Sequence, residues 1–255
     1  MRRAAALALP IVALAACDPP RDAGRAASST PPPASAPAAH VVAASPVPAS
    51  PLAARELTDE ARTFYLARSD EYRAERLLAL EESGRVSRYG GVLTLRLASG
   101  RRVALIDTIV DGGAFRRFLY VGHLRELGVH VVEATFYEGG EFRVYHDATG
   151  QEVTLAGPPI PSPDGTRFAV ASVDLHAGYD PNVLEVWRAT PRGLTREYAV
   201  DGGDAWGPAD VAWDGFERLR FVEERVSDRM GDGEDTVRTP ASLVHVDGRW
   251  VVEQR

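Results

Sequence analysis

The sequence predicts a mainly β domain, in which a helical segment is followed by blade-like antiparallel β-meanders. From Val86 onward, helical spacing of apolar residues disappears, and short β-rich runs alternate with glycine turns. The chain from about 114 to 255 also divides into three successive units of roughly 40 to 50 residues with about four strands each. A β-sandwich is the alternative architecture, because both folds consist of short strands joined by tight turns.

The first 16 residues have the pattern of an export signal. Arg2 and Arg3 form a short positive region, and residues 4–16 form an apolar run broken only by Pro10. This run is too short to span a bilayer as a helix, and its length is typical of a signal-peptide core. We therefore expect residues 1–16 to be cleaved.

Cys17, the only cysteine in the chain, follows this run directly. The stretch Leu14-Ala15-Ala16-Cys17 resembles the lipobox of bacterial lipoproteins. The resemblance implies cleavage before Cys17, a diacylglyceryl group on its thiol and often a further acyl chain such as palmitate on the new N-terminus. Two or three acyl chains hold a soluble domain stably at a membrane, whereas one is marginal. A reactive thiol or an intermolecular disulfide is the alternative for an odd cysteine.

The lipid anchor would place the protein in the bacterial cell envelope. Asp18 after the cysteine resembles the signal that retains enterobacterial lipoproteins in the inner membrane, facing the periplasm. That rule depends on the lineage, so the outer membrane stays an alternative.

Residues 17–52 are expected to be a lipidated cysteine followed by a disordered tether. Positions 18–52 hold nine of the 18 prolines and ten alanines, with almost no large apolar side chain to bury. Such a chain would span roughly 30 Å as a flexible coil and up to roughly 110 Å as polyproline II. Its expected role is to lift the following domain away from the bilayer.

Residues 53–85 are expected to be helical, as one long helix or two short ones. Thr58 or Asp59 is a possible N-cap, acidic residues follow in the first turn, and Gly84 comes after the last periodic position. The apolar stripe is imperfect, so packing against the β region is favoured over partner binding.

The β-rich domain is expected to cover residues 86–255. Residues 92–97 and 102–106 read as a hairpin that turns at Ser99-Gly100. In the three later units, Gly150, Gly193 and Gly248 each lie at a tight turn between two strands, where positive φ favours glycine.

The spacing of these units is typical of β-propeller blades. The stretch "PSPDGTRFAVAS", residues 161–172, resembles the Ser-Pro-Asp-Gly turn of TolB-like and WD40-like propeller repeats, which joins the first two strands of a blade. The third unit keeps only the Asp-Gly of this motif, and the first unit lacks it. The resemblance therefore implies blade-like sheets in a small or partial propeller, which closes into a ring or stays open.

The charge of the domain disfavours two classes of partner. The chain carries −7, Arg2 and Arg3 lie in the signal, and the tether's charges cancel, which leaves about −9 on the domain. A surface this acidic disfavours nucleic acid and anionic lipid.

Four common catalytic motifs are absent. The sequence has no His-Glu-x-x-His, no Gly-x-Ser-x-Gly, no phosphate-binding glycine loop and, in the domain, no cysteine nucleophile. This favours a non-catalytic binding or scaffolding role that needs no cofactor. The alternative is a hydrolase-like envelope enzyme whose site is assembled from distant residues: His123, His146, His176, Asp174 and Asp180.

The loops between the second and third strands of the units occupy equivalent positions, so we expect them on one face. They and the glycine-rich loop at 201–210 supply the candidate binding residues for a protein or glycan partner: Tyr137, Asp174, His176, Tyr179, Asp180, Asn182 and Trp206. Trp206 is the tryptophan with the greatest expected exposure, whereas Trp187 and Trp250 lie within strands and are expected in the core.

A calcium-stabilised module is a third hypothesis. The loop at 225–240 gathers four acidic residues near two glycines, and calcium binds carboxylates on such loops. They are Asp228, Asp232, Glu234 and Asp235. Their spacing does not fit the Asp-x-Asp-x-Asp-Gly loop, so a solvated acidic loop is favoured and no metal is expected.

Overall fold

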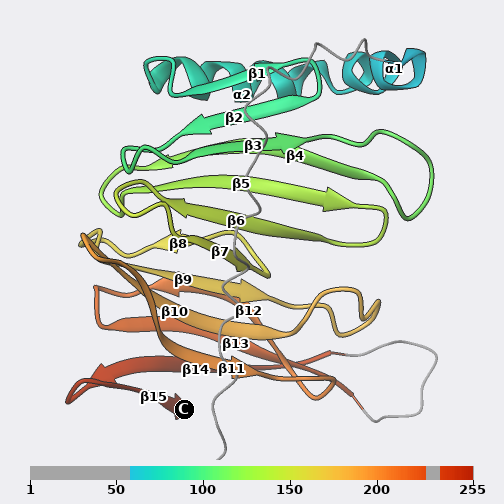
Figure 1. Ribbon diagram of the computed structural model, residues 1–255. Coiled ribbons are helices and arrows are strands. Elements are labelled where there is room, and N and C mark those ends of the chain that lie inside the picture. The colour runs from blue at the N-terminus through green and yellow to red at the C-terminus, as the bar shows by residue number, and fades with distance from the viewer. Residues whose placement is uncertain (1–57, 228–235, 255) are drawn as a thin grey trace, which may run out of the picture. The chain divides into compact units, whose positions relative to one another are not determined.

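A computed structural model describes residues 58–227 and 236–254 (Figure 1). All of them belong to one compact unit of the chain, residues 51–255. The predicted signal, Cys17, the tether and the acidic residues Asp228, Asp232, Glu234 and Asp235 lie outside the described residues. The described chain is mainly β, with two helices followed by four antiparallel sheets, as the sequence predicts.

The helical segment consists of two short helices, α1 (Asp59–Ala67) and α2 (Ser69–Glu81). Thr58 is the N-cap of α1, and its hydroxyl oxygen accepts a hydrogen bond from the backbone N–H of Ala61 at 3.2 Å. Arg68 separates the helices with non-helical dihedral angles. Neither helix of the described chain is long and apolar enough to cross a bilayer.

The first sheet has three strands in the order β1-β2-β3. Their bounds are β1 (Val86–Tyr89), β2 (Val92–Arg96) and β3 (Arg102–Ile106). β2 and β3 form the predicted hairpin, and Gly100 in its turn has a φ of 85°. β1 adds a strand to that hairpin through a two-residue turn, Gly90-Gly91.

The other three sheets each have four strands and correspond to the three predicted units. The second sheet is β4 (Arg116–Leu124), β5 (Val129–Phe136), β6 (Gly140–His146) and β7 (Glu152–Leu155). The third is β8 (Ile160–Pro161), β9 (Arg167–Ser172), β10 (Val183–Thr190) and β11 (Gly193–Asp201). The fourth is β12 (Gly207–Trp213), β13 (Arg218–Val226), β14 (Thr236–Val246) and β15 (Arg249–Gln254). In every sheet, strands that are neighbours in sequence pair antiparallel, which is a meander.

The Pro-Asp-Gly turn joins β8 to β9, the first two strands of the third sheet. The Ser162 hydroxyl donates to the Asp164 carboxylate at 2.6 Å and accepts the backbone N–H of Arg167 at 3.0 Å. Gly165 completes the turn with a φ of 64°. These hydrogen bonds explain why serine, aspartate and glycine occur together at this turn.

Three hydrophobic clusters join the sheets in chain order. The first combines β2 and β3 with the second sheet and with Leu78 and Ala79 of α2. The next two join the second sheet to the third and the third to the fourth. Within the described residues, no such cluster joins the fourth sheet to the first. Trp187 and Trp250 lie in these clusters, as predicted.

Candidate functional site

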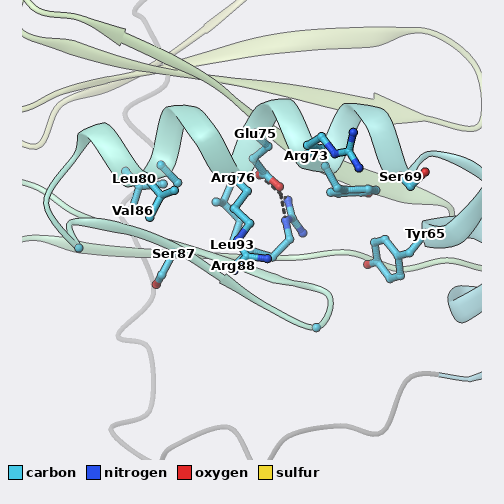
Figure 2. A pocket seen from close by; sticks show the side chains of 14 residues that line it. Tyr65, Ser69, Arg73, Glu75, Arg76, Leu80, Val86, Ser87, Arg88 and Leu93 are labelled. Carbon is cyan, nitrogen blue, oxygen red and sulfur yellow. Dashed lines mark hydrogen bonds and ion pairs between the residues drawn. The ribbon is translucent and has the colours of Figure 1, made fainter.

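A groove lies between the helices and the first sheet (Figure 2). Its volume is about 740 Å³. We call it the helix–strand groove. It is lined chiefly by Tyr65 of α1, by Ser69, Tyr72, Arg73, Glu75, Arg76 and Leu80 of α2, by Val86, Ser87 and Arg88 of β1, and by Leu93 of β2.

The helical repeat places the α2 residues on this groove. Ser69, Arg73, Arg76 and Leu80 follow one another at intervals of three or four residues, so they lie on one face of the helix. Leu80 is 70% exposed, and Arg73 and Arg76 are also exposed. An apolar side chain and two cations are thus presented to solvent along one wall.

A buried ionic cluster forms the base of the groove. The Arg88 guanidinium lies between two carboxylates, 2.6 Å from Glu75 and 2.9 Å from Asp107. The Tyr65 hydroxyl donates a further hydrogen bond to Asp107 at 2.7 Å. Burial raises the pKa of Asp107, and the positive charge of Arg88 opposes that shift. The Arg88 guanidinium is therefore the counter-ion of two carboxylates that are nearly inaccessible to water.

This ionic cluster also covers the edge of the second sheet. The backbone N–H of Tyr120 donates to Glu75 at 2.9 Å, and that of Phe118 donates to Asp107 at 2.8 Å. Arg88 donates to the Phe118 carbonyl. Side chains thus satisfy backbone groups that would otherwise be open to another strand at the edge of β4.

Two features of the groove have no partner among the described residues. The Tyr72 hydroxyl is buried but forms no hydrogen bond there, and burial raises its pKa. Arg73 and Arg76 form no ion pair or hydrogen bond with any described side chain. Of the three arginines in the lining, Arg88 is paired with Glu75 and Asp107, so Arg73 and Arg76 supply the unpaired positive charge in a domain of about −9. The groove is therefore a local cationic region that suits a ligand with negative charge.

The loops predicted to share a face do come together in part. Residues 138–140 of the first loop and 179–181 of the second line a second cavity of about 360 Å³, to which Tyr179 and Asp180 contribute. Tyr137 and Tyr179 are each 63% exposed. The residues of the 228–235 part of the third loop are outside the described chain.

Several predicted loop residues have structural contacts. The Asp174 carboxylate accepts backbone N–H groups of Asp180, Tyr179 and Ala177, which fixes its own loop and lowers its pKa. Asn182 is buried, accepts the N–H of Asp174 and donates to the Gly203 carbonyl at 2.8 Å. Trp206 is partly buried against Phe221 at a ring-centroid distance of 6.3 Å. His176 is exposed on its loop.

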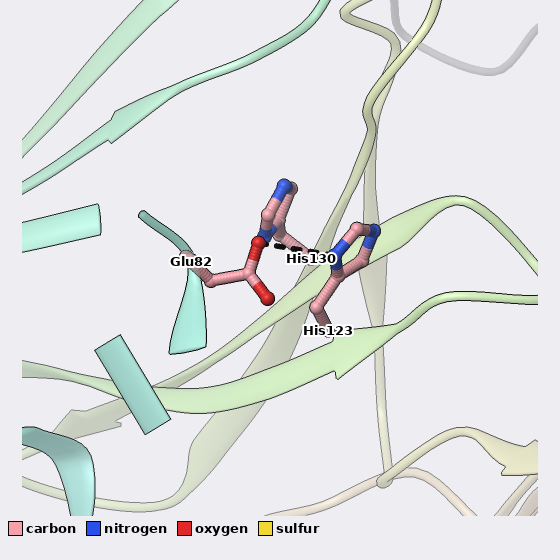
Figure 3. Close-up of side chains that lie close together, drawn as sticks. All are labelled: Glu82, His123 and His130. Carbon is pink, nitrogen blue, oxygen red and sulfur yellow. Dashed lines mark hydrogen bonds and ion pairs between the residues drawn. The ribbon is translucent and has the colours of Figure 1, made fainter. Parts of the chain in front are cut away.

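The residues of the enzyme hypothesis share neither of these two cavities. Asp180 lines the second cavity, whereas no histidine lines either of the two cavities. His146 contacts Thr149 in its own turn at 2.8 Å. His123 lies with Glu82 and His130 instead, between α2 and the second sheet (Figure 3).

Glu82, His123 and His130 are close enough together to raise the question of a metal site, since their potential ligand atoms lie within 4.8 Å of one another. However, the two imidazole rings are stacked, with centroids 4.1 Å apart and planes inclined by 19°. A metal ion binds an imidazole nitrogen in the plane of the ring, so nearly parallel stacked rings cannot both bind one ion without turning. Glu82 is also held by Arg85 and Arg125, each at 3.0 Å. The cluster therefore fits a pair of neutral histidines better than a metal site.

The environment of the histidine pair favours its neutral form. The His130 Nδ1 lies 3.0 Å from the Tyr120 hydroxyl, and its Nε2 lies 3.5 Å from Asp147 without a hydrogen bond. Burial, with a contribution from His123, lowers the pKa of His130 to about 4. Burial also lowers the pKa of His123, although Glu82 opposes this at 3.2 Å.

Sequence reasoning missed the groove and the histidine pair. The available signal for the groove was the position of Leu80, which lies outside the apolar stripe of the helical segment and is 70% exposed. The signal for the histidine pair was the hairpin, because β4–β5 pairing places His123 opposite His130.

No protein-family model and no curated protein matches this chain. Three matching solved structures are the N-terminal domain of Nup159, an S. cerevisiae complex of Dbp5 with Nup159 and Gle1, and the tricorn protease. Their identities are 12%, 12% and 11%, with TM-scores of 0.29, 0.31 and 0.34. The matches cover 67%, 67% and 64% of this chain but only 47%, 46% and 18% of those chains. This chain spans less than half of each, and the scores assign it no relative.

Proposed function

We propose that this protein is a lipid-anchored binding module of the bacterial cell envelope, and that its helix–strand groove holds the partner. The observation that carries the proposal is the groove itself, in which Arg73, Arg76 and the Tyr72 hydroxyl have no partner among the described residues. Buried polar groups are normally hydrogen-bonded, so a free one in a cavity wall is a position for a ligand group. The sequence of residues 1–52 supports the anchor and the tether.

The anchor is tested by Cys17→Ala. We expect the variant to lose incorporation of labelled palmitate and to leave the membrane fraction, because the thiol is the expected attachment point. The measurement is metabolic labelling followed by membrane fractionation of the full chain. Labelling equal to that of the wild type would show that residues 14–17 do not form a lipobox.

The binding role is tested by site-specific photo-crosslinking in intact cells. A benzophenone amino acid at Arg76 should give a discrete adduct, whereas the same probe at exposed Arg192 should not. Adding Arg73→Glu should weaken the Arg76 adduct if the ligand is anionic. Arg102→Glu, a matched change at an exposed position of β3, should leave the yield of the Arg76 adduct unchanged.

Two outcomes would contradict a binding role for the groove. One is the absence of any adduct at Arg76. The other is an adduct of equal yield at Arg192. An adduct obtained only with the probe at Tyr179 would assign partner binding to the second cavity instead.

A further inference from the structure

β1 is the edge of a sheet that has one strand fewer than its neighbours. The first sheet contains three strands, whereas each of the other three sheets contains four. Within the described chain, β1 pairs only with β2. Its other edge is available for a further strand.

The register shows which backbone groups face that edge. Arg85 accepts a hydrogen bond from the backbone N–H of Arg96 at 2.8 Å, so this pair is a hydrogen-bonded position of the ladder. In an antiparallel pair, alternate residues turn their N–H and C=O groups toward the partner strand. Ser87 and Tyr89 therefore bond to β2, and Val86 and Arg88 direct their backbone groups away from it. No other described residue pairs with those groups.

The same residues, Val86 and Arg88, line the helix–strand groove opposite α2 (Figure 2). The other edge beside α2, that of β4, is occupied by Glu75, Asp107 and Arg88 as described above. The fold therefore covers one strand edge with charged side chains and leaves the β1 edge facing a cavity. An extended peptide in that cavity would have main-chain hydrogen bonds on one side and a helix wall on the other, which is the geometry of strand addition.

We propose that the groove binds an extended, acidic segment of a partner protein, which adds to β1 as a fourth strand. This inference rests on the proposed binding function and specifies its ligand. The segment carries carboxylates that pair with Arg73 and Arg76, and apolar side chains that pack on Leu80 and Val86. Strand addition gives affinity through the main chain, whereas the two arginines give preference for an acidic sequence.

Charge and composition disfavour two occupants that this chain could supply. Pairing of β1 with β1 of a second copy would bring the Arg73 and Arg76 side chains of both copies to the same groove, and like charges repel. The tether has nine prolines in residues 18–52, and proline lacks the N–H that a sheet ladder needs. An acidic segment of a partner protein meets neither of these two objections.

The experiment is amide hydrogen exchange on the full-length protein in detergent micelles. The probe is a synthetic hexapeptide of alternating glutamate and valine with both ends blocked. At saturation we expect the exchange of the Val86 and Arg88 amides to slow at least tenfold. The Ser87 and Tyr89 amides, already bonded to β2, are the internal reference and should change little.

Matched peptides and variants separate strand pairing from simple charge attraction. Two further peptides carry N-methyl groups either on the glutamates or on the valines. At least one of the two should give no protection, because methylation removes the N–H groups that donate hydrogen bonds to β1. Replacement of glutamate by lysine should weaken binding at least tenfold. The double variant Arg73→Glu/Arg76→Glu should also bind the acidic peptide at least tenfold more weakly. The control Arg102→Glu/Arg192→Glu has an equal charge change at exposed positions elsewhere and should bind it like the wild type.

Each contrary outcome points to a different error. No binding, or binding without protection of Val86 and Arg88, overturns strand addition, and an Arg76 crosslink would then still support the binding function. The Val86 and Arg88 amides could instead be protected already in the free protein. Protection that does not depend on protein concentration would assign the β1 edge to the chain's own tether. Protection that increases with protein concentration would assign it to a second copy. Absence of the Arg76 crosslink, by contrast, contradicts the binding function itself.

Discussion

Replacing Arg88 with methionine is expected to destabilise the domain by about 3–5 kcal/mol, because it leaves two buried carboxylates without their counter-ion. The Glu75 and Asp107 side chains are only 3% and 1% exposed, so water cannot take over the role of the guanidinium. A domain of this size has a total stability of about 5–15 kcal/mol. The expected loss is therefore a large part of the total.

The measurement is urea unfolding of the full chain, where this loss would lower the midpoint by about 1 M or more. Arg218→Met is the matched control. Its ion pair with Glu253 has a similar length, 3.0 Å, but the two side chains are 33% and 52% exposed. Exposed pairs contribute about 1 kcal/mol or less, so the control should unfold close to the wild type.

A triple variant tests whether unpaired charge is the cause of the loss. Arg88→Met combined with Glu75→Gln and Asp107→Asn removes all three charges and keeps oxygens that accept the Tyr120 and Phe118 N–H groups. It should be more stable than Arg88→Met alone. If the triple variant is no more stable, or if Arg88→Met costs under about 1 kcal/mol, the ionic cluster does not have the role assigned to it.

The histidine pair is expected to make the domain sensitive to acid. The pKa of His130 is lowered from 6.5 to about 4 in the folded protein. Between these values the unfolded chain binds a proton that the folded chain does not, so protons favour unfolding. Stability is then fully present above about pH 6.5 and falls as the pH decreases toward 4. The loss from His130 alone is about 3 kcal/mol at pH 4, and His123 shifts in the same direction.

The test is urea unfolding measured across this pH range for the wild type and for His130→Gln. The variant keeps an oxygen that can accept from Tyr120 but has no imidazole, so its stability should depend less steeply on pH between 6.5 and 4. Arg192→Gln, the same replacement by glutamine at an exposed turn position, is the control and should keep the wild-type profile. Parallel profiles for wild type and His130→Gln would show that His130 does not contribute to the acid sensitivity.

The order of elements was predictable because it depends on local pattern. Glycine turns at positions 150, 193 and 248, alternating strands and the Ser-Pro-Asp-Gly turn indicated the meanders, and the structure has all of them. The N-cap at Thr58 and the two-helix alternative for residues 53–85 follow from the same local chemistry. What local pattern could not give was the contact between elements, such as the position of Trp206 against Phe221.

The sequence by itself determined the mainly β class, the meander units and the acidic domain, and it alone supports the lipid anchor at Cys17. These features are properties of neighbouring residues and of composition. The tertiary structure decided that α2 faces β1 across a groove, that Arg88 joins Glu75 to Asp107, and that His123 stacks on His130 beside Glu82. The residues of the ionic cluster are separated by 13 and 19 positions in sequence. Only the packing of the helices on two successive sheets brings them together, because no periodicity along the chain encodes which faces meet.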